Sequence, residues 1–594
     1  MTLISDKTGQ FAKSKEQDMS SGVCYLTTIE DLFVLGQDIA IGPHCFVGRD
    51  EVFPEWKSLV FADPIPTEDA MEENEKMLRG LLNHLLPEIT TRLNHYHGTS
   101  YSIEFWRIIV IPWLIELLQM TWTSFIRLRM VIDQNSSRSI TVKISQDDFD
   151  WKFKGTLDFM HTYLEDYRFK WWIDSRIISI LAPSHWRLIP SEPINHPKIK
   201  VPKDPPRSKV VSTFTRCVRN VKYCLGFTDI SPLRWSGLFL ALYVNLLPKS
   251  PSRVKFKVDP DFRPERFFPN SFLGELNRLI DLTMPESLQG GFPALAAKAK
   301  RFPYFPGRLR LGTLSNWNDQ EKVISAFATE AGEKRVDVQY GGEYGMLKYN
   351  MLYNEIKANL CFFVSWGWTY NDPDIGHVLP LPSPLHSKMA NKHRRENDNI
   401  IFVITSFRLL LSRIHWTTQI NTPIRICHET VNFLEKLQGH VRESVVLRPH
   451  FRTTNDIEIQ DVVRVKFPTI PILDSDLDNA LMKCCLVVLN SFGTAMNLSM
   501  AANVPTIIYL SPDLMKPREE AEPYFNPLRR CGVIHDSPEA AAEHLNYIHH
   551  NIEGWWNSGD VQDARKIWVR QFARTDSFWW WQWMIQLAGL RNSG

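Results

Sequence analysis

The chain has 594 residues, well beyond the roughly 250–300 at which one hydrophobic core stops growing, so more than one domain is expected. Hydrophobic residues make up 44% and charged residues 23%, which excludes a disordered, collagen-like or polytopic membrane protein. Lys plus Arg total 68 against 66 for Asp plus Glu, a net charge of +2. That balance leaves little basic excess for nucleic acid, so no nucleic-acid partner is expected.

Other features of composition favour a cytoplasmic protein. None of the nine cysteines lies in a CxxC pair or at zinc-ligand spacing, which indicates small buried side chains in a reducing compartment. The first residues lack the apolar run of a secretory signal. The apolar segments 108–115 and 235–247 are shorter than the roughly 18 residues of a spanning helix, so both are predicted to be buried helices.

The N-terminal half is predicted to be rich in helices. Residues 1–29 are expected to form a flexible leader, and an apolar run at 32–35 predicts a strand that ends at Gly36. Helical spacing then extends from about 70 to 185, and the proline-rich stretch 190–206 predicts a connector before further helices.

From residue 308 the pattern changes to alternating strands and helices. The first series is predicted to comprise a strand at 308–315, a helix at 319–334, and strands at 336–341 and 359–368. A second series is predicted to comprise strands from 399 and at 444–447, a helix at 478–484, a strand at 486–490, a helix at 494–502 and a strand at 505–510. The intervening residues 370–398 look like a linker. The alternation predicts parallel sheets in two lobes with a cleft between them.

The tail, residues 562–590, predicts one or two helices. Trp583 and Leu587 are four residues apart and share a helical face, which Trp579 extends. This face is expected to pack back on the N-terminal lobe. Contact with a membrane surface is the alternative, because Trp is favoured at the lipid interface.

The best-marked site is the segment Ser491-Phe492-Gly493-Thr494 between a buried strand and a helix. The free N–H groups at a helix start suit a phosphate, and ligands of open α/β sheets gather at the carboxyl ends of strands. Arg448 follows the preceding strand and can grip a phosphate through two hydrogen bonds. An ordinary helix cap and a surface ion pair are the alternatives. The predicted donor-binding residues are Arg448, His450, Asn490, Ser491, Gly493 and Thr494.

A second candidate is the segment Gln339-Tyr340-Gly341-Gly342, where paired glycines after a strand permit close approach of the backbone to a ligand. A plain tight turn is the alternative. Three Asp-x-Asp pairs, at 148–150, 372–374 and 474–476, lack the context of a metal site, so neither a metal nor another cofactor is expected.

Several of these segments resemble the transferases of bacterial surface-carbohydrate loci, which serve lipopolysaccharide, O-antigen and capsule. The resemblance runs from about residue 30 to 575 and is most specific in 503–557, which contains NVPTIIYL, REEAEPYFNPLRRCGVIHDSPEAAAEHL and IEGWWNS. It includes Leu93-Asn94 with His97-Gly98, the segment FWRIIVIPWL, Gln339 with Gly341-Gly342, and Trp366-Gly367-Trp368. The chain departs from the family pattern at Tyr340, Gln37 and Leu498, where His, an acidic residue and Glu are usual.

The resemblance implies a GT-B-like glycosyltransferase with two Rossmann-like lobes. Residues 30–385 are then the acceptor-binding lobe with helical insertions, 386–565 the nucleotide-sugar lobe, and 566–594 a helix that crosses back. The candidate catalytic residues are His97, Glu104, Tyr340 and Glu343. The candidate acceptor or cleft residues are Gly36, Gln37, Arg107, Gln339, Gly341 and Gly342.

The predicted function is transfer of a sugar from a nucleotide-activated donor to a glycan or lipid-linked glycan, with at most peripheral contact with the inner membrane. The sequence favours no donor among a CMP-linked acidic sugar and UDP-, GDP- and dTDP-sugars. A CDP-linked polyol-phosphate transferase and a non-catalytic scaffold of a glycan-assembly complex are the alternatives.

Overall fold

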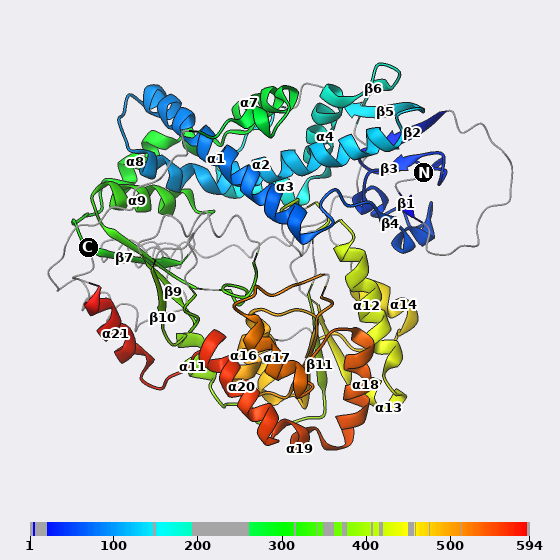
Figure 1. The fold of residues 1–594 in the computed structure, drawn as a ribbon, viewed down its shortest axis with the longest axis vertical. Coiled ribbons are helices and arrows are strands. Elements are labelled where there is room, and N and C mark those ends of the chain that lie inside the picture. Colours follow the sequence, from blue (N-terminus) through cyan, green and yellow to red (C-terminus); the bar gives the residue numbers. More distant parts are fainter. Residues whose placement is uncertain are drawn as a thin grey trace, which may run out of the picture.

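The computed structural model contains three parallel β-sheets surrounded by helices (Figure 1). The structure describes strand β1 (Ile4–Ser5) and residues 21–146, 150–192, 261–313, 317–339, 341–348, 362–370, 377–405, 408–410, 412–414, 420–449, 457, 459–473, 476–512 and 514–590. The α/β class with parallel sheets, predicted from the alternation of strands and helices, is confirmed.

The N-terminal sheet has the order β3-β2-β5-β6 and is entirely parallel. Its strands are β2 (Ser21–Tyr25), β3 (Ile39–Ala40), β5 (Ser139–Ser145) and β6 (Arg187–Ser191); β1 pairs separately with β4 (Val60–Phe61). The sequence pattern did not indicate this sheet, and β2 lies in the stretch expected to be a flexible leader. The strand predicted at 32–35 is wrong. The Asp38 carboxylate accepts the backbone N–H of Val34 at 2.9 Å and holds this segment in a turn, where Leu32 is 84% exposed.

Two long helices, α1 (Glu68–His97) and α2 (Ile103–Gln134), pack against each other above the central and C-terminal sheets in Figure 1. Helix α1 ends at Gly98, whose φ of +61° is readily adopted by glycine. Among the described residues, α2 alone is long and apolar enough to cross a membrane, but its most apolar window is fully buried inside the protein. This confirms 108–115 as part of a buried helix, while 235–247 lies outside the described residues. The other helices among the described residues of this half are α3 (Thr156–Glu165), α4 (Tyr167–Leu181), α7 (Asn270–Thr283) and α8 (Phe292–Ala299).

The central sheet has the order β10-β9-β8-β7 and is also parallel. Its elements are β7 (Leu309–Thr313), α9 (Asp319–Glu330), β8 (Lys334–Val338), β9 (Phe362–Ser365), β10 (His377–Pro380) and α11 (Pro384–Met389). The linker predicted at 370–398 is therefore wrong where β10 and α11 lie. Strand β10 is at the sheet edge, where a proline such as Pro380 is tolerated. The prolines of this stretch therefore predicted a linker although part of it is a strand.

The C-terminal sheet is parallel with the order β12-β11-β13-β14-β15. Its strands are β11 (Ile400–Ile404), β12 (Val445–Pro449), β13 (Leu486–Leu489), β14 (Thr506–Tyr509) and β15 (Ile534–His535). The chain places β12 on one side of β11 and then returns to place β13 on the other. Its helices are α12 (Thr422–Lys436), α13 (Gly439–Arg442), α14 (Ile459–Lys466), α15 (Leu477–Lys483), α16 (Thr494–Ala502), α17 (Glu522–Arg530), α18 (Pro538–Ile548) and α19 (Ile552–Trp556).

The last two helices, α20 (Gly559–Phe572) and α21 (Trp579–Gly589), carry the chain from the C-terminal sheet back to the central sheet (Figure 1). Trp583 and Leu587 are buried in one cluster with Leu311, Val336 and Val364 of the central sheet, on the shared face that their spacing predicted. The Trp583 indole N–H donates to the Pro382 carbonyl oxygen at 2.9 Å.

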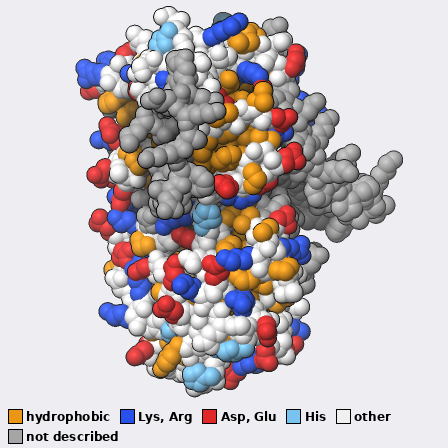
Figure 2. Space-filling view, turned by 90° about the vertical axis from the view of Figure 1, so that its right-hand side faces the viewer, with side chains coloured by type: hydrophobic (Ala, Val, Ile, Leu, Met, Phe, Trp, Pro, Cys, Tyr) orange, Lys and Arg blue, Asp and Glu red, His pale blue; other side chains and the backbone are white. Residues whose placement is uncertain are grey.

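On the face shown in Figure 2, acidic and basic side chains are interspersed rather than gathered by sign. This distribution agrees with the net charge of +2.

Candidate functional site

The Gln339 side chain organises the turn that follows β8. It is 1% exposed, and its amide oxygen accepts the backbone N–H of Trp366 at 3.0 Å and the indole N–H of Trp368 at 2.8 Å. Its amide nitrogen donates to the Gly341 carbonyl oxygen at 2.8 Å. Gln339 therefore joins the carboxyl ends of β8 and β9 and fixes the path of the glycine pair.

Gly342 brings the central sheet into direct contact with the C-terminal sheet. A Cβ atom at this position would lie 2.1 Å from both the Gly493 carbonyl carbon and the Thr494 nitrogen, so only glycine fits without a backbone shift. The Gly342 N–H donates to the Thr494 hydroxyl oxygen at 3.0 Å, and the Asn497 side-chain amide donates to the Gly342 carbonyl at 3.3 Å. The two glycine-containing turns singled out in the sequence thus form one structure.

This contact lies at the topological switch point of the C-terminal sheet, between the carboxyl ends of β11 and β13. Ligands of open α/β sheets bind at such points. The Asn490 side-chain oxygen accepts the Thr405 N–H at 2.8 Å, and the Thr405 and Ser491 hydroxyls are hydrogen-bonded to each other. Helix α16 begins here after Gly493, and its first N–H groups face outward from the helix end, which suits an anion.

Glu343 is the carboxyl group beside this helix start. A Cβ atom at Gly493 would lie 3.7 Å from the Glu343 Cγ, which is ordinary van der Waals contact. Burial raises the pKa of Glu343 to about 7, and the nearby Arg413 opposes part of that rise. A carboxyl group with a pKa near neutrality is suited to general base catalysis.

Arg413 is held in place by α2. Its guanidinium forms two hydrogen bonds with the fully buried Glu116 carboxylate, at 3.0 and 2.5 Å. The segment after β11 is fixed further by the Gln119 side-chain oxygen, which accepts the Ile414 N–H at 3.0 Å, and by the Tyr163 hydroxyl oxygen, which accepts the Ser412 N–H at 2.7 Å. Glu116 and Arg413 are not among the site residues predicted from the sequence. The available signal was Glu116 itself, because a carboxylate inside an apolar helix needs a buried partner.

The predicted donor residue Arg448 lies on the same sheet edge as the Ser491–Thr494 turn, with one strand between them. Val403 of β11 is in register with both Arg448 of β12 and Leu489 of β13, which places their backbones about 10 Å apart. Arg448 is 9% exposed and donates from Nη1 to the Pro449 carbonyl oxygen at 2.9 Å.

His97 is the last residue of α1, and Glu104 lies in the first turn of α2. The His97 ring nitrogen Nε2 is 2.9 Å from the Leu288 carbonyl oxygen, and the ring stacks on Trp106. Glu104 is in the first turn of α2, and the twelve residues that separate it from Glu116 correspond to about 18 Å of helix. Neither residue is brought to Glu343 and Gly493 by the contacts of the described residues.

Gly36 and Gln37 are at the amino edge of the N-terminal sheet. The Gln37 carbonyl oxygen accepts a hydrogen bond from Arg138, which precedes β5, and it closely approaches Gly22 near the start of β2. Outside this sheet, Asn421 at the start of α12 bonds to both backbone groups of Phe61 in β4. Arg107 is 2% exposed within α2.

Tyr340 and His450 lie outside the described residues, as do Asp148, Asp372, Asp374 and Asp474. Leu498, one of the departures from the family pattern, is buried in α16. Within the described part of the chain, no group of three or more His, Cys, Asp or Glu residues is arranged to hold a metal ion. Five described cysteines are buried, and Cys531 is partly exposed.

The arrangement defines an α/β protein in which the candidate site lies at the carboxyl edge of a parallel sheet. A family model described as LIC12162 family transferase matches residues 23–587, nearly the whole chain. The chain therefore belongs to the LIC12162 family of transferases. A search of curated proteins finds no match.

Proposed function

We propose that this transferase is a glycosyltransferase of the GT-B type, which moves a sugar from a nucleotide-activated donor to a surface glycan or lipid-linked glycan. The observation that carries the proposal is the contact of Gly342 with Gly493 and Thr494, which places Glu343 beside the start of α16. The contact holds a carboxyl group beside a helix end whose N–H groups are suited to a phosphate, between two parallel sheets.

The nucleotide diphosphate or monophosphate of the donor binds at the α16 N-terminus. Free N–H groups and the helix dipole stabilise the phosphate as negative charge develops on it. The Ser491 and Thr494 hydroxyls add polar contacts, and Arg448 at the end of β12, two strands from β13, supplies a cation. In this proposal, these groups stabilise the leaving phosphate without a metal ion.

Glu343 acts as the general base. Its carboxylate takes the proton of the acceptor hydroxyl, the hydroxyl oxygen bonds to the anomeric carbon of the sugar, and the bond from that carbon to the phosphate oxygen breaks. Glu343 is preferred because it lies beside Gly493, whereas His97 ends α1 and Glu104 lies in the first turn of α2, about 18 Å along that helix from Glu116. The reaction belongs on the cytoplasmic side of the membrane, where nucleotide sugars are made.

The test is a thermal-shift screen with CMP, UDP, GDP and dTDP, followed by product analysis with the matching nucleotide sugar. A nucleotide at about 100 times its dissociation constant stabilises the folded protein by roughly 2.7 kcal/mol, which a melting curve resolves. Transfer that persists in EDTA is expected. Failure of all four nucleotides to shift the melting temperature would favour the scaffold alternative.

A further inference from the structure

A small cavity lies where α2 meets the segments that follow β4 and β11. Its polar lining consists of Asp63, Thr123, Arg127, Ser412 and Arg413. Its volume is about 30 Å³, and one water molecule needs roughly 10–15 Å³ measured in this way. The cavity therefore has room for a group the size of a carboxylate but not for a sugar ring.

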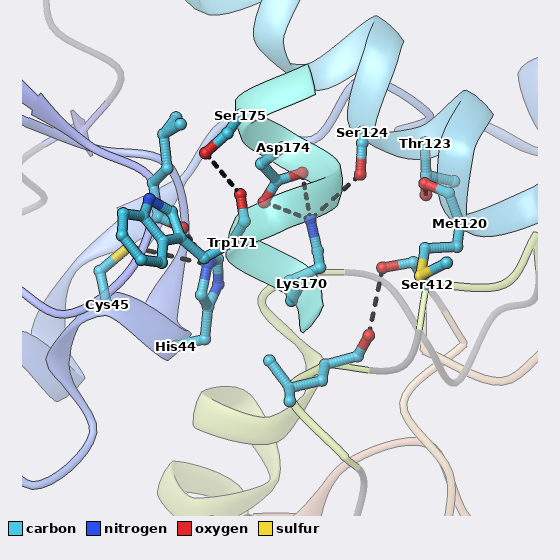
Figure 3. A network of polar contacts seen from close by, with 12 residues as sticks. His44, Cys45, Met120, Thr123, Ser124, Lys170, Trp171, Asp174, Ser175 and Ser412 are labelled. Carbon is cyan, nitrogen blue, oxygen red and sulfur yellow. Dashed lines mark hydrogen bonds and ion pairs between the residues drawn. The ribbon is translucent and has the colours of Figure 1, made fainter. Parts of the chain in front are cut away.

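The neighbouring cations are already neutralised by carboxylates of the protein. Arg413 makes its two hydrogen bonds with Glu116. Lys170, in α4 beside the cavity, is 2.5 Å from both oxygens of Asp174 and donates to the Ser124 hydroxyl at 3.1 Å (Figure 3). These two cations have structural roles. Arg127 also lines the cavity, where its positive charge offsets part of the rise that burial causes in the pKa of Asp63.

The hydroxyl groups of the cavity are also occupied. Thr123 donates to the Gln119 carbonyl oxygen at 2.8 Å. Ser412, labelled in Figure 3, donates to the Leu410 carbonyl oxygen at 3.3 Å. By contrast, the buried Nε of Arg127 has no hydrogen-bond acceptor among the described residues. A buried donor without an acceptor is costly and is commonly completed by a water molecule or a bound ligand.

Asp63 does not supply the missing acceptor, although it faces the same cavity. Its two oxygens accept the backbone N–H groups of Ile65 at 2.9 Å and Ile420 at 3.3 Å. These bonds spread its negative charge into the backbone, which reduces its repulsion of a second anion. Asp63 also retains lone pairs that can accept a sugar hydroxyl.

We propose that Arg127 binds the carboxylate of an acidic sugar, with Asp63 accepting a neighbouring hydroxyl of the same sugar. The inference rests on the proposed glycosyl transfer and names its substrate class. The planar guanidinium matches a carboxylate through paired N–H donors. The small volume admits only that group, so the ring remains outside the cavity.

The experiment uses saturation-transfer NMR to measure the affinities for N-acetylneuraminate and glucuronate. Each affinity is compared with that for the neutral methyl ester of the same sugar. The wild-type protein is expected to bind at least one acid about tenfold more tightly than its ester. In Arg127→Gln the preference is expected to fall below twofold, and Arg127→Lys should retain part of it. The matched control is Arg129→Gln, because Arg129 lies on the same helix, is 58% exposed and pairs only loosely with Asp133 at 3.9 Å.

A wild-type protein that binds acid and ester equally, or an equal loss in Arg129→Gln, overturns the inference. Nucleotide binding tests the proposed function separately from the carboxylate site. The nucleotide should raise the melting temperature of Arg127→Gln as it does that of the wild-type protein, even where the carboxylate preference is lost. Comparing CMP with CMP-N-acetylneuraminate then locates the carboxylate. If Arg127→Gln weakens the binding of CMP-N-acetylneuraminate but not that of CMP, the carboxylate belongs to the donor. If the wild-type protein binds the two nucleotides equally and still prefers the free acid to its ester, the carboxylate belongs to the acceptor.

Discussion

Helix α2 passes two clusters of buried charge that differ in how completely their polar atoms are satisfied. Near its start, the Lys322 ammonium donates to Asp319 at 2.7 Å, to the Thr156 hydroxyl at 2.5 Å and to the Ile109 carbonyl at 3.0 Å. Asp319 in turn accepts both the N–H and the hydroxyl of Thr156. Each charge has its partners, so this cluster fastens α9 and α3 to α2.

Farther along α2, around Arg413 and Arg127, the charged groups are incompletely matched. Glu343 has a pKa near neutrality because it is buried, and the Arg127 Nε has no acceptor among the described residues. Buried charges that have hydrogen-bond or ion-pair partners stabilise a fold, whereas buried groups that lack such partners are available to bind a ligand. The comparison therefore separates a structural cluster from a functional one along a single helix.

The largest effect is expected from Lys322→Ala. Removing the ammonium leaves the Asp319 carboxylate buried without its cation, which should lower the free energy of unfolding by about 3–5 kcal/mol. Urea denaturation measures this loss. Lys566→Ala, in the exposed part of α20, is the control and should change stability by less than about 0.5 kcal/mol. Similar curves for the two variants would remove the distinction between the clusters.

Glu343→Gln should reduce the turnover rate by about 10²–10⁴-fold, because the amide cannot accept the acceptor proton. In the wild-type protein the rate should rise with pH through about 7, the pKa of the folded state. That pKa is raised from 4.5, so the folded state binds more protons between pH 4.5 and 7 and its stability falls as pH rises through this window. The glutamine variant should lose this fall and be the more stable protein at pH 8. An unchanged pH dependence of both properties would exclude Glu343 as the base.

Gly342→Ala should reduce transfer by about 10²-fold, because the new methyl group forces apart turns that position the reacting groups. The initial rate at saturating donor measures the effect. Gly274→Ala is a matched control: its Cβ would meet no atom within 4 Å, and the change in helix α7 should stabilise the protein slightly. Normal transfer by Gly342→Ala would show that the contact between the sheets is dispensable.

The smallest effect is expected from Thr494→Val, which removes the acceptor of the Gly342 N–H bond. A net hydrogen bond contributes about 0.5–1.5 kcal/mol, so nucleotide affinity should weaken by roughly three- to tenfold. Isothermal titration calorimetry measures the change, and the melting temperature without ligand tests whether the fold is intact. Unaltered affinity would mean that this hydroxyl acts only between the two turns.

The sequence by itself determined the elements whose signals are local. The strands at 309–313 and 486–489 and helix α16 follow from apolar runs bounded by turn residues. The face shared by Trp583 and Leu587 follows from helical spacing alone. The two turns around Gly342 and Gly493 were likewise visible, since glycine pairs and a short loop before a helix are local patterns.

Only the tertiary structure decided which of these patterns meet. Strands β2 and β10 are recognisable because of their partner strands, which lie more than ten residues away in the sequence and leave no local trace. The bond from Arg413 to Glu116 and the cavity beside Arg127 join segments almost 300 residues apart. The sequence around a charged residue does not show which acceptor it will contact. Whether the residue stabilises the fold or binds a ligand is therefore decided by the folded structure, in which its partners can be identified.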